Sequence, residues 1–242
     1  MAKVIVVKNA DEAANEAFKV MKDFLKPGKV LGLATGSTPL GLYALMVKDH
    51  NENGTDYKDI LTFNLDEYVN LPITHPESYY AFMHRNLFDL IGIPEENTHV
   101  PSGLGDNLDE QCKAYDEMIE EHPVDIQLLG IGSDGHIAFN EPGTAFDSGT
   151  HVTDLAESTI KDNARFFDYD MSKVPTKACT QGIGTIMKAK NILLIATGAN
   201  KAQAVKDMLE GPVDEKCPAS ILQKHPDVTI IVDEEAAELL KK

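Results

Sequence analysis

Two carboxylates and a histidine stand within eight residues near the middle of the chain, at Asp134, His136 and Glu141. An imidazole titrates near neutral pH, so a histidine flanked by carboxylates is suited to accept and donate protons. Three glycines between positions 130 and 135 let the backbone turn sharply and approach a ligand closely. This pattern fits a proton-transfer site, and it fits equally well a polar loop with a capping aspartate and an exposed histidine.

A second acidic group, Asp66 with Glu67, directly follows the apolar run 60–65. A strand that ends at Asp66 places its carboxylate at the edge of an open α/β sheet where ligands bind. Burial at that edge raises the pKa of a carboxyl group and makes it usable as a base. The alternative is a loop acid that caps the helix expected near Glu77 or that is simply solvated.

Two glycine-containing turns suit a phosphate group. The connection 32–39 carries Gly36, Ser37 and Thr38 between an expected strand and a helix, with Thr38 expected as N-cap and Pro39 as the first helical residue. Backbone N–H groups and hydroxyls at a helix N-terminus bind anions readily. The segment is neither a Walker loop nor a dinucleotide motif, and a capped helix with incidental hydroxyls is the alternative.

Two cations support the phosphate interpretation. Lys201 lies in the second turn, 196–201, which also follows an apolar run, and Arg165 lies in a segment without clear periodicity. An arginine binds a phosphate with two parallel hydrogen bonds, so the pair suits a phosphomonoester. Single surface cations are more often only solvated.

The elements that position these residues alternate along the chain. Strands are predicted at 4–7, 30–33, 60–64, 124–129, 191–196 and 228–232, the first of them covered on both faces. Helical patterns are predicted at 11–25, 39–47, 77–90 and 108–121, and from near 200 and near 233. This alternation predicts a single α/β domain over residues 1–242, a Rossmann-like open, largely parallel sheet with helices on both faces.

Residues 150–176 do not fit the alternation. They have weak periodicity and mix charges with three aromatic side chains. A connection of this length without regular structure is usually a lid, a binding loop or disorder, and its aromatic content favours a lid.

Composition narrows the class of protein. The 242 residues carry a net charge of −17, which disfavours nucleic acid as a partner and requires a local site for any anionic substrate. Three scattered cysteines predict reduced thiols, with neither a disulfide framework nor a zinc site. Neither a signal segment nor a membrane span is predicted, so we expect a cytoplasmic protein.

Five blocks together resemble the glucosamine-6-phosphate deaminases. In family order, they are LGLATGSTPLGLY (31–43), FNLDEYVNLPITHPESYYAFMHRNLF (63–88), GIGSDGHIAFNEP (130–142), NARFF (163–167) and TGANKA (197–202). The resemblance covers nearly the whole chain. It implies conversion of glucosamine 6-phosphate and water to fructose 6-phosphate and ammonium, with no metal or organic cofactor.

The resemblance also implies a role for each site residue. Asp66 would move the proton of the opened sugar from C2 to C1. Asp134, His136 and Glu141 would form the ring-opening group, with His136 passing a proton between the ring oxygen and O1. The phosphate would be held by five residues, namely Gly36, Ser37, Thr38, Arg165 and Lys201.

One departure from the family pattern concerns regulation. Longer, allosteric members carry a basic pair just after the catalytic loop, where this chain has His151 and Thr153. We therefore expect an enzyme that needs no amino-sugar phosphate activator. Its subunit number stays open, and both a monomer and a homo-oligomer fit.

Other functions remain open at this point. A 6-phosphogluconolactonase would share the phosphate site but has no use for a base at Asp66. An epimeric hexosamine phosphate is an alternative substrate. A non-catalytic sugar-phosphate sensor would keep Arg165 and Lys201 but has no use for His136 among the carboxylates.

Overall fold

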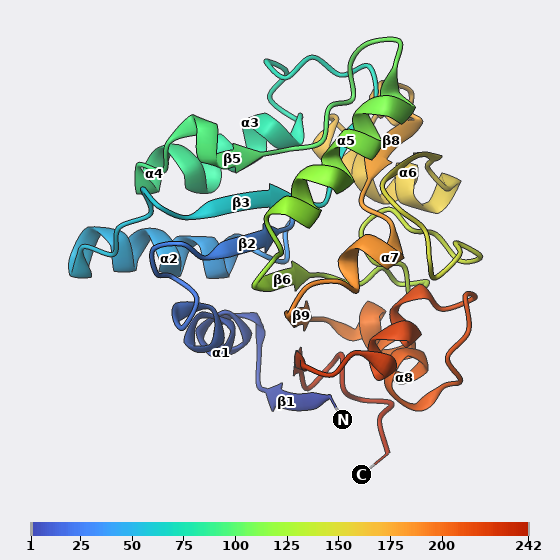
Figure 1. Cartoon of the computed structure of the whole chain (residues 1–242). Coiled ribbons are helices and arrows are strands. Elements are labelled where there is room, and N and C mark those ends of the chain that lie inside the picture. The colour runs from blue at the N-terminus through green and yellow to red at the C-terminus, as the bar shows by residue number, and fades with distance from the viewer. Residues whose placement is uncertain (1, 242) are drawn as a thin grey trace.

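The computed structural model describes residues 2–241 and consists of a large sheet enclosed by helices, with a small sheet at one end (Figure 1). The strands are β1 (Lys3–Val7), β2 (Val30–Leu33), β3 (Leu61–Asn64), β4 (Asp66–Tyr68), β5 (Thr98–His99), β6 (Ile126–Leu129), β7 (His151–Asp154), β8 (Lys177–Thr180), β9 (Asn191–Ala196) and β10 (Val228–Asp233). The helices are α1 (Ala10–Lys22), α2 (Leu40–Asn53), α3 (Tyr79–Met83), α4 (Asp89–Ile91), α5 (Leu108–Glu121), α6 (Glu157–Asn163), α7 (Ile183–Ile186) and α8 (Ala202–Glu210).

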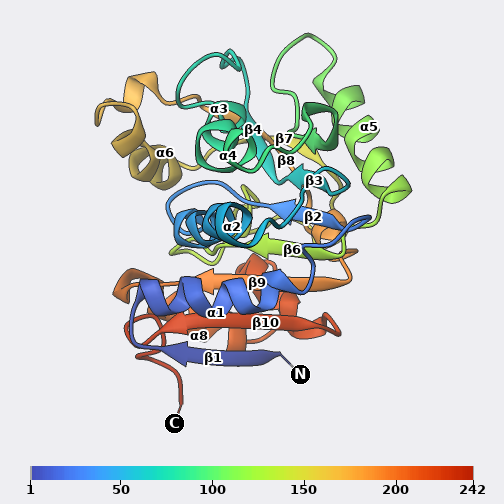
Figure 2. The ribbon, with the colours of Figure 1, turned by 90° about the vertical axis from the view of Figure 1, so that its left-hand side faces the viewer.

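The large sheet has the order β1-β10-β9-β6-β2-β3-β5, and every pairing in it is parallel. Figure 2 shows α1 and α2 in front of this sheet and α8 behind it. The predicted α/β architecture, a largely parallel sheet with helices on both faces, is therefore confirmed. Within residues 2–241, no helix combines the length and the apolar character that crossing a membrane requires.

The chain reverses its direction across the sheet between β2 and β6. From β2 it proceeds to β3 and β5 on one side, and it later returns through β6 to β9 and β10 on the other. In open α/β sheets the crevice at such a switch point, at the carboxyl ends of the strands, is where ligands bind. At the amino ends of β2 and β6, Asp125 joins the two strands. Its carboxylate accepts a hydrogen bond from the N–H of Val30 at 2.9 Å.

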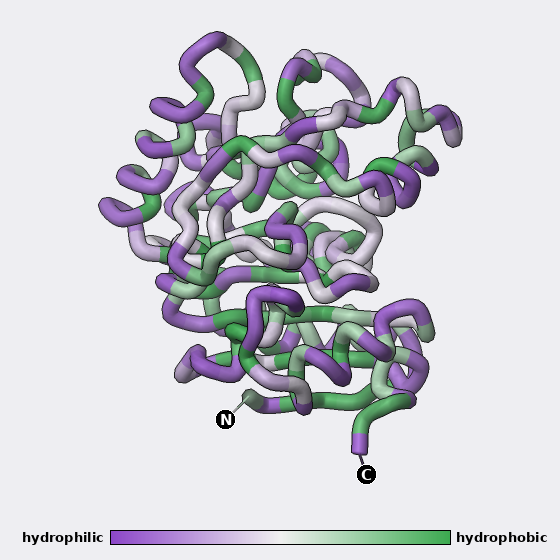
Figure 3. Tube along the Cα trace, turned by 90° about the vertical axis from the view of Figure 1, so that its right-hand side faces the viewer, coloured by the Kyte–Doolittle hydropathy of each residue, from purple (hydrophilic) through white to green (hydrophobic). Residues whose placement is uncertain are grey.

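The strand predictions are confirmed in place, but β1 differs from its expected environment. It forms one edge of the sheet, and Val4 and Val6 are 39% and 53% exposed. Figure 3 shows the strands as green, apolar segments through the interior, with the green run of β1 at the margin near both ends of the chain. A continuous β-branched run therefore marks an edge strand here, where a doubly covered strand was expected.

Two helix predictions also need correction. Up to residue 241, turns follow β10 in place of the expected helix, although the side chain of Asp233 accepts the N–H of Ala236 at 2.8 Å as an N-cap would. At the other turn, Pro39 occupies the N-cap position of α2 without a side-chain hydrogen bond, so Thr38 is not the cap. The helix also continues beyond the predicted end to Asn53, where Gly54 stops it with a φ of 73°.

Residues 150–176 are not without regular structure. They include β7, α6 and two 3₁₀ turns, and β7 joins β8 and β4 in a small antiparallel sheet. This region packs around its own apolar cluster, formed by Tyr68, Leu71, Phe139, Leu155, Ala164, Phe167, Val174 and Ala178. The large sheet has a separate and much larger core. The small sheet matters for the site because β4 begins at Asp66.

Candidate active site

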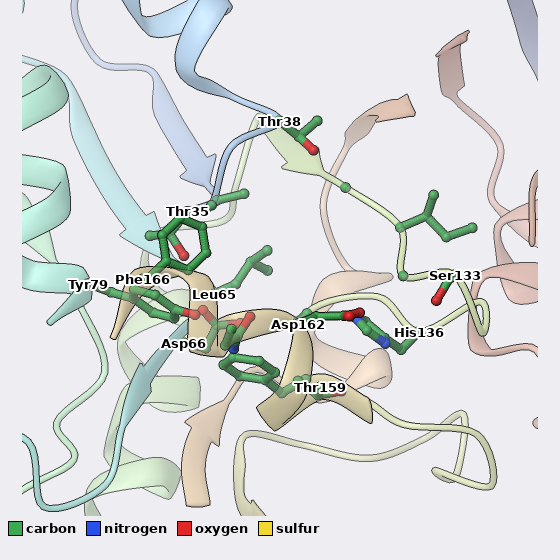
Figure 4. A pocket seen from close by; sticks show the side chains of 18 of the residues that line it. Thr35, Thr38, Leu65, Asp66, Tyr79, Ser133, His136, Thr159, Asp162 and Phe166 are labelled. Atoms are coloured by element: carbon green, nitrogen blue, oxygen red, sulfur yellow. The ribbon is translucent and has the colours of Figure 1, made fainter. Parts of the chain in front are cut away.

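A pocket of about 180 Å³ opens at the carboxyl ends of β2, β3 and β6, with the segment that contains α6 along one side. Six predicted site residues line it, namely Gly36, Thr38, Asp66, His136, Arg165 and Lys201. The other three lie next to it: Asp134 and Glu141 contact the ring of His136, and Ser37 contacts Arg165. Figure 4 shows Asp66 and His136 reaching the pocket from different segments, with Thr159 and Asp162 on α6 nearby.

His136 is held by two carboxylates through one ring nitrogen. Its Nδ1 lies 2.7 Å from Oδ1 of Asp134 and 3.6 Å from Oε2 of Glu141. Burial disfavours the charged imidazole, but the two carboxylates outweigh it and raise the pKa of His136 to about 9. The contact with His136 in turn lowers the pKa of Asp134 well below its usual value. His136 is therefore protonated at neutral pH and poised to act first as an acid.

The loop around His136 depends on its glycines. A Cβ on Gly132 would lie 2.2 Å from the imidazole, so a side chain there would displace the ring. Gly135 has a φ of 86°, and its Cβ would meet the thiol of Cys217 at 2.7 Å. Ala138 has a φ of 51°, which is unusual for a residue other than glycine. Such a backbone conformation persists only where the surrounding structure enforces it. Ala138 lies in the wall of the pocket.

Asp66 is 6% exposed and lies at the start of β4, directly after β3. Burial raises its pKa to about 8, with a further contribution from the neighbouring Glu67 and an opposing one from His136. A carboxylate that gains its charge only at such a high pH is a strong base once ionised. The predicted effect of burial on this residue is therefore confirmed.

The sequence left open that an acid at 66 or 67 caps the helix expected near residue 77, and in the structure Glu67 does so. Its carboxylate accepts hydrogen bonds from the backbone N–H groups of Tyr79 and Tyr80, each at 2.9 Å. A third comes from the N–H of Tyr68, also at 2.9 Å. These bonds leave Glu67 committed to structure, and they turn the side chain of Asp66, its neighbour in the strand, to the pocket.

The loop after β2 is shaped as an anion site. Gly36 has a φ of 87°, and nothing lies within 4 Å of the position a Cβ would take. The buried hydroxyl of Tyr43 fixes the start of the loop, since it accepts the N–H of Ala34 at 3.2 Å and donates to its carbonyl at 2.5 Å. Thr35, Gly36 and Thr38 all line the pocket.

Two cations face this loop. The Nη2 of Arg165 lies 3.4 Å from Oγ of Ser37. Burial lowers the pKa of Lys201, and Arg165 contributes to the same effect. The turn before Lys201 is fixed by Asp233, whose two carboxylate oxygens each accept the N–H of Gly198 at 3.0 Å. A bound dianion would relieve the mutual repulsion of the two cations.

The group around His136 also has the donor types of a metal site. One ligand atom from each of Asp134, His136 and Glu141 lies within 4.8 Å of the others. In such a site a divalent ion would have to displace the proton of His136, whose raised pKa makes that costly. The arrangement suits proton transfer without a metal.

Several pocket residues were missed from sequence, chiefly Thr35, Tyr79, Thr159, Asp162, Asn163 and Phe166. Thr159 donates to Oε1 of Glu141 at 2.7 Å, and Asn163 donates to the hydroxyl of Tyr68 at 2.9 Å. Both lie in the segment whose weak periodicity concealed α6. Asn163 belongs to the block NARFF, but for Thr159 the sequence offered only the position of that segment between Glu141 and the cation Arg165.

Comparison with known proteins identifies the family to which this chain is similar. A profile of the family described as glucosamine-6-phosphate isomerases/6-phosphogluconolactonase matches residues 7–231. A glucosamine-6-phosphate deaminase of Clostridium perfringens (strain 13 / Type A) is 51% identical over 242 residues, which cover 99% of this chain and 100% of the relative. One from Thermoanaerobacter pseudethanolicus is 48% identical over 241 residues, with 98% and 95% covered.

Solved structures with a similar fold include proteins of two different activities. A monomeric glucosamine-6-phosphate deaminase superposes with a TM-score of 0.95 at 43% identity, over 98% of this chain and 99% of that one. The 6-phosphogluconolactonase from Trypanosoma cruzi superposes with a TM-score of 0.82 at 23% identity, over 100% and 98%. The second likeness shows a common fold.

The burial of Asp66 predicts a change in stability with pH. An unfolded chain loses the Asp66 proton near pH 3.8, whereas the folded chain keeps it to about pH 8. Between these values the folded state binds more protons, so this residue lowers the free energy of unfolding as pH rises. The free energy of unfolding of Asp66→Asn should equal that of the parent at pH 4 and exceed it at pH 9. The difference at pH 9 should be on the order of a few kcal/mol, since each pKa unit corresponds to about 1.4 kcal/mol. Urea unfolding at both pH values measures the difference, and parallel pH dependences would contradict it.

The contact between Asp134 and His136 predicts a shift in a titration. Asp134→Asn removes one of the charges that stabilise the imidazolium, so the pKa of His136 should fall from about 9 towards its usual value. NMR titration of the His136 ring protons measures this directly. Asp147→Asn, which removes an exposed acid in the following loop, serves as the control and should leave the titration unchanged. An unchanged pKa in the Asp134 variant would show that the carboxylate does not hold the proton.

Proposed function

The chain belongs to the family of glucosamine-6-phosphate isomerases and 6-phosphogluconolactonases, and from this membership we propose that it is a glucosamine-6-phosphate deaminase. The reaction converts glucosamine 6-phosphate and water to fructose 6-phosphate and ammonium. The observation that carries this assignment is the presence of two separate proton-transfer groups, Asp66 and His136, in one pocket with a phosphate loop.

Ring opening is the step that His136 suits. Its Nδ1 faces the carboxylates of Asp134 and Glu141, which leaves Nε2 for the substrate. With a pKa of about 9, the imidazolium donates its proton to the ring oxygen and then accepts the proton of the O1 hydroxyl. The two carboxylates stabilise the charged form at the beginning and end of this cycle, so no net charge is created.

Proton transfer between carbons is the step that Asp66 suits. The ionised carboxylate takes the proton from C2 of the open-chain sugar while the aldehyde oxygen O1 gains a proton, and it then returns its proton to C1. The amino group gives up a proton, so that a C=N double bond at C2 replaces the C=O double bond at C1. Water then adds at C2, and ammonium leaves to give the ketose. A lactonase hydrolyses an ester and has no carbon-bound proton to move, so the buried base favours the deaminase over the lactonase activity of the family.

The phosphate lies remote from both steps. Binding at Gly36, Ser37 and Thr38, with Arg165 and Lys201, supplies binding energy that fixes C1 and C2 between Asp66 and His136. The same contacts draw the segment 150–176 over the substrate, which is the role we assign to it as a lid. This closure keeps water from the sugar until hydrolysis is due.

We further infer that turnover needs no amino-sugar phosphate activator and that the protein works in the cytoplasm. The positions that correspond to the basic pair of allosteric relatives hold His151 and Thr153 in β7, and the Nδ1 of His151 lies 2.7 Å from the carbonyl of Gly149. A relative with 43% identity is described as monomeric, which supports a monomer here.

The assignment is tested by ammonium release. The purified protein with glucosamine 6-phosphate should release one ammonium per fructose 6-phosphate, with a hyperbolic dependence on substrate and without an activator. Because the pocket itself supplies the protons, excess EDTA should leave the rate unchanged. Parallel assays with galactosamine 6-phosphate and 6-phosphogluconolactone should proceed far more slowly. Faster hydrolysis of the lactone, or no ammonium at all, would overturn the assignment.

The division of roles is tested by two variants. Asp66→Asn keeps the shape of the side chain but removes the base, so kcat should fall by roughly 10²- to 10⁴-fold. Binding of 2-amino-2-deoxyglucitol 6-phosphate, an open-chain analogue that cannot cyclise, should persist in this variant. His136→Gln should slow ring opening, and supply of open-chain substrate should restore part of its activity. Substantial turnover by Asp66→Asn would remove Asp66 as the base.

A further inference from the structure

The two carboxylate oxygens of Glu141 face different parts of the chain, and one of them accepts a hydrogen bond. Its Oε1 accepts the hydroxyl of Thr159 at 2.7 Å, and its Oε2 lies 3.6 Å from Nδ1 of His136. Oε2 is buried without a hydrogen-bond partner. The hydroxyl of Thr159 therefore determines which oxygen faces the imidazole and at what distance.

Thr159 occupies a position built for this contact. It is 5% exposed, although its neighbour Ser158 on the same helix is exposed. A hydroxyl buried at this level keeps its partner, because loss of a buried hydrogen bond is costly. The two partners are 18 residues apart, so the bond joins the catalytic loop to α6 and is not a local turn.

The same helix also reaches the other parts of the pocket. One turn beyond Thr159, Asn163 donates to the hydroxyl of Tyr68 at 2.9 Å, in the strand that begins with Asp66. Directly after α6, Arg165 approaches Ser37 of the phosphate loop at 3.4 Å. Residues i and i+4 lie on one face of a helix, so Thr159 and Asn163 point to the same side.

α6 is too firmly packed for these contacts to move independently. Ile160 packs against the small apolar cluster that contains Phe167 and Ala164, just beyond the helix. A shift that brings Arg165 onto a phosphate must therefore carry Thr159 with it. One packed segment therefore carries Thr159, Asn163 and Arg165, which contact the catalytic loop, β4 and the phosphate loop.

We propose that Thr159 is a positioning residue for ring opening, whose hydroxyl fixes the carboxylate of Glu141 against His136 when Arg165 engages the substrate phosphate. The inference rests on the proposed deaminase function and deepens it, because it states how remote binding energy reaches the ring-opening group. Without the hydroxyl, Glu141 is free to rotate away from the imidazole, and the ring-opening group loses one of its two charges.

The first test compares three variants at α6. Thr159→Val keeps the shape of the side chain without the hydroxyl, and kcat should fall on the order of tenfold to a hundredfold, as expected for a misplaced catalytic group. Thr159→Ser restores the hydroxyl and should recover most of the activity. The matched control Ser158→Ala removes an exposed hydroxyl from the same helix and should behave as the parent.

A binding measurement separates positioning from damage to the lid. 2-Amino-2-deoxyglucitol 6-phosphate needs no ring opening, so its Kd should be the same for the parent and for Thr159→Val. A merely structural role would weaken this binding together with kcat, and that result would overturn the proposal. Equal activity of Thr159→Val and the parent would overturn it as well, whereas failure of the parent to release ammonium would refute the deaminase assignment itself.

The link to the phosphate is tested by a double-mutant cycle. If Arg165 brings Thr159 into place, Arg165→Ala already forfeits the benefit of the hydroxyl. Adding Thr159→Val to Arg165→Ala should then lower kcat by less than threefold, compared with the larger loss in the parent background. Losses that multiply fully would show that Thr159 acts independently of the phosphate contact.

Discussion

Parallel hydrogen bonding between β3, β2, β6 and β9 brings four strand ends to one edge of the sheet, and the polar groups of the site follow from those ends. Asp66 continues β3, His136 lies in the loop after β6, and the phosphate turns follow β2 and β9. Side chains alternate between the two faces of a strand, so a slip of one residue would reverse every face. The active site thus depends on strand register before it depends on any motif.

Electrostatics in the pocket oppose the charge of the whole molecule. With a net charge of −17, the protein repels a sugar phosphate at long range. In the site that we propose, attraction would arise at short range, from the backbone N–H groups after β2 together with Arg165 and Lys201. On the other side of the same pocket, burial delays the ionisation of Asp66. The strands of the sheet thus hold the phosphate loop and the carboxylate of Asp66 on different sides of the pocket.

Sequence predicted the parts of the structure that local patterns determine. Apolar runs located the central strands, and the residue types of Asp134, His136 and Glu141 suggested a proton-transfer site or a polar loop; the fold brings the three side chains together. Contacts between distant segments were not predictable in this way. The place of β1 at the edge of the sheet, the contact of Asp233 with Gly198, and the bond from Thr159 to Glu141 each depend on segments remote in sequence. The strand β7 escaped notice for the same reason, because only its pairing with β8 defines it.

The separate apolar cluster beneath α6 has a consequence for local unfolding. Proteins open in cooperative units, and a unit with its own small core detaches at a lower free energy than the whole molecule. The cluster of Tyr68, Phe139, Phe167 and Val174 is much smaller than the core around the seven-stranded sheet. We therefore expect the amide protons of α6 to exchange faster than those of β9. If this segment is the lid that we propose, substrate would enter when it opens locally while the central sheet stays intact.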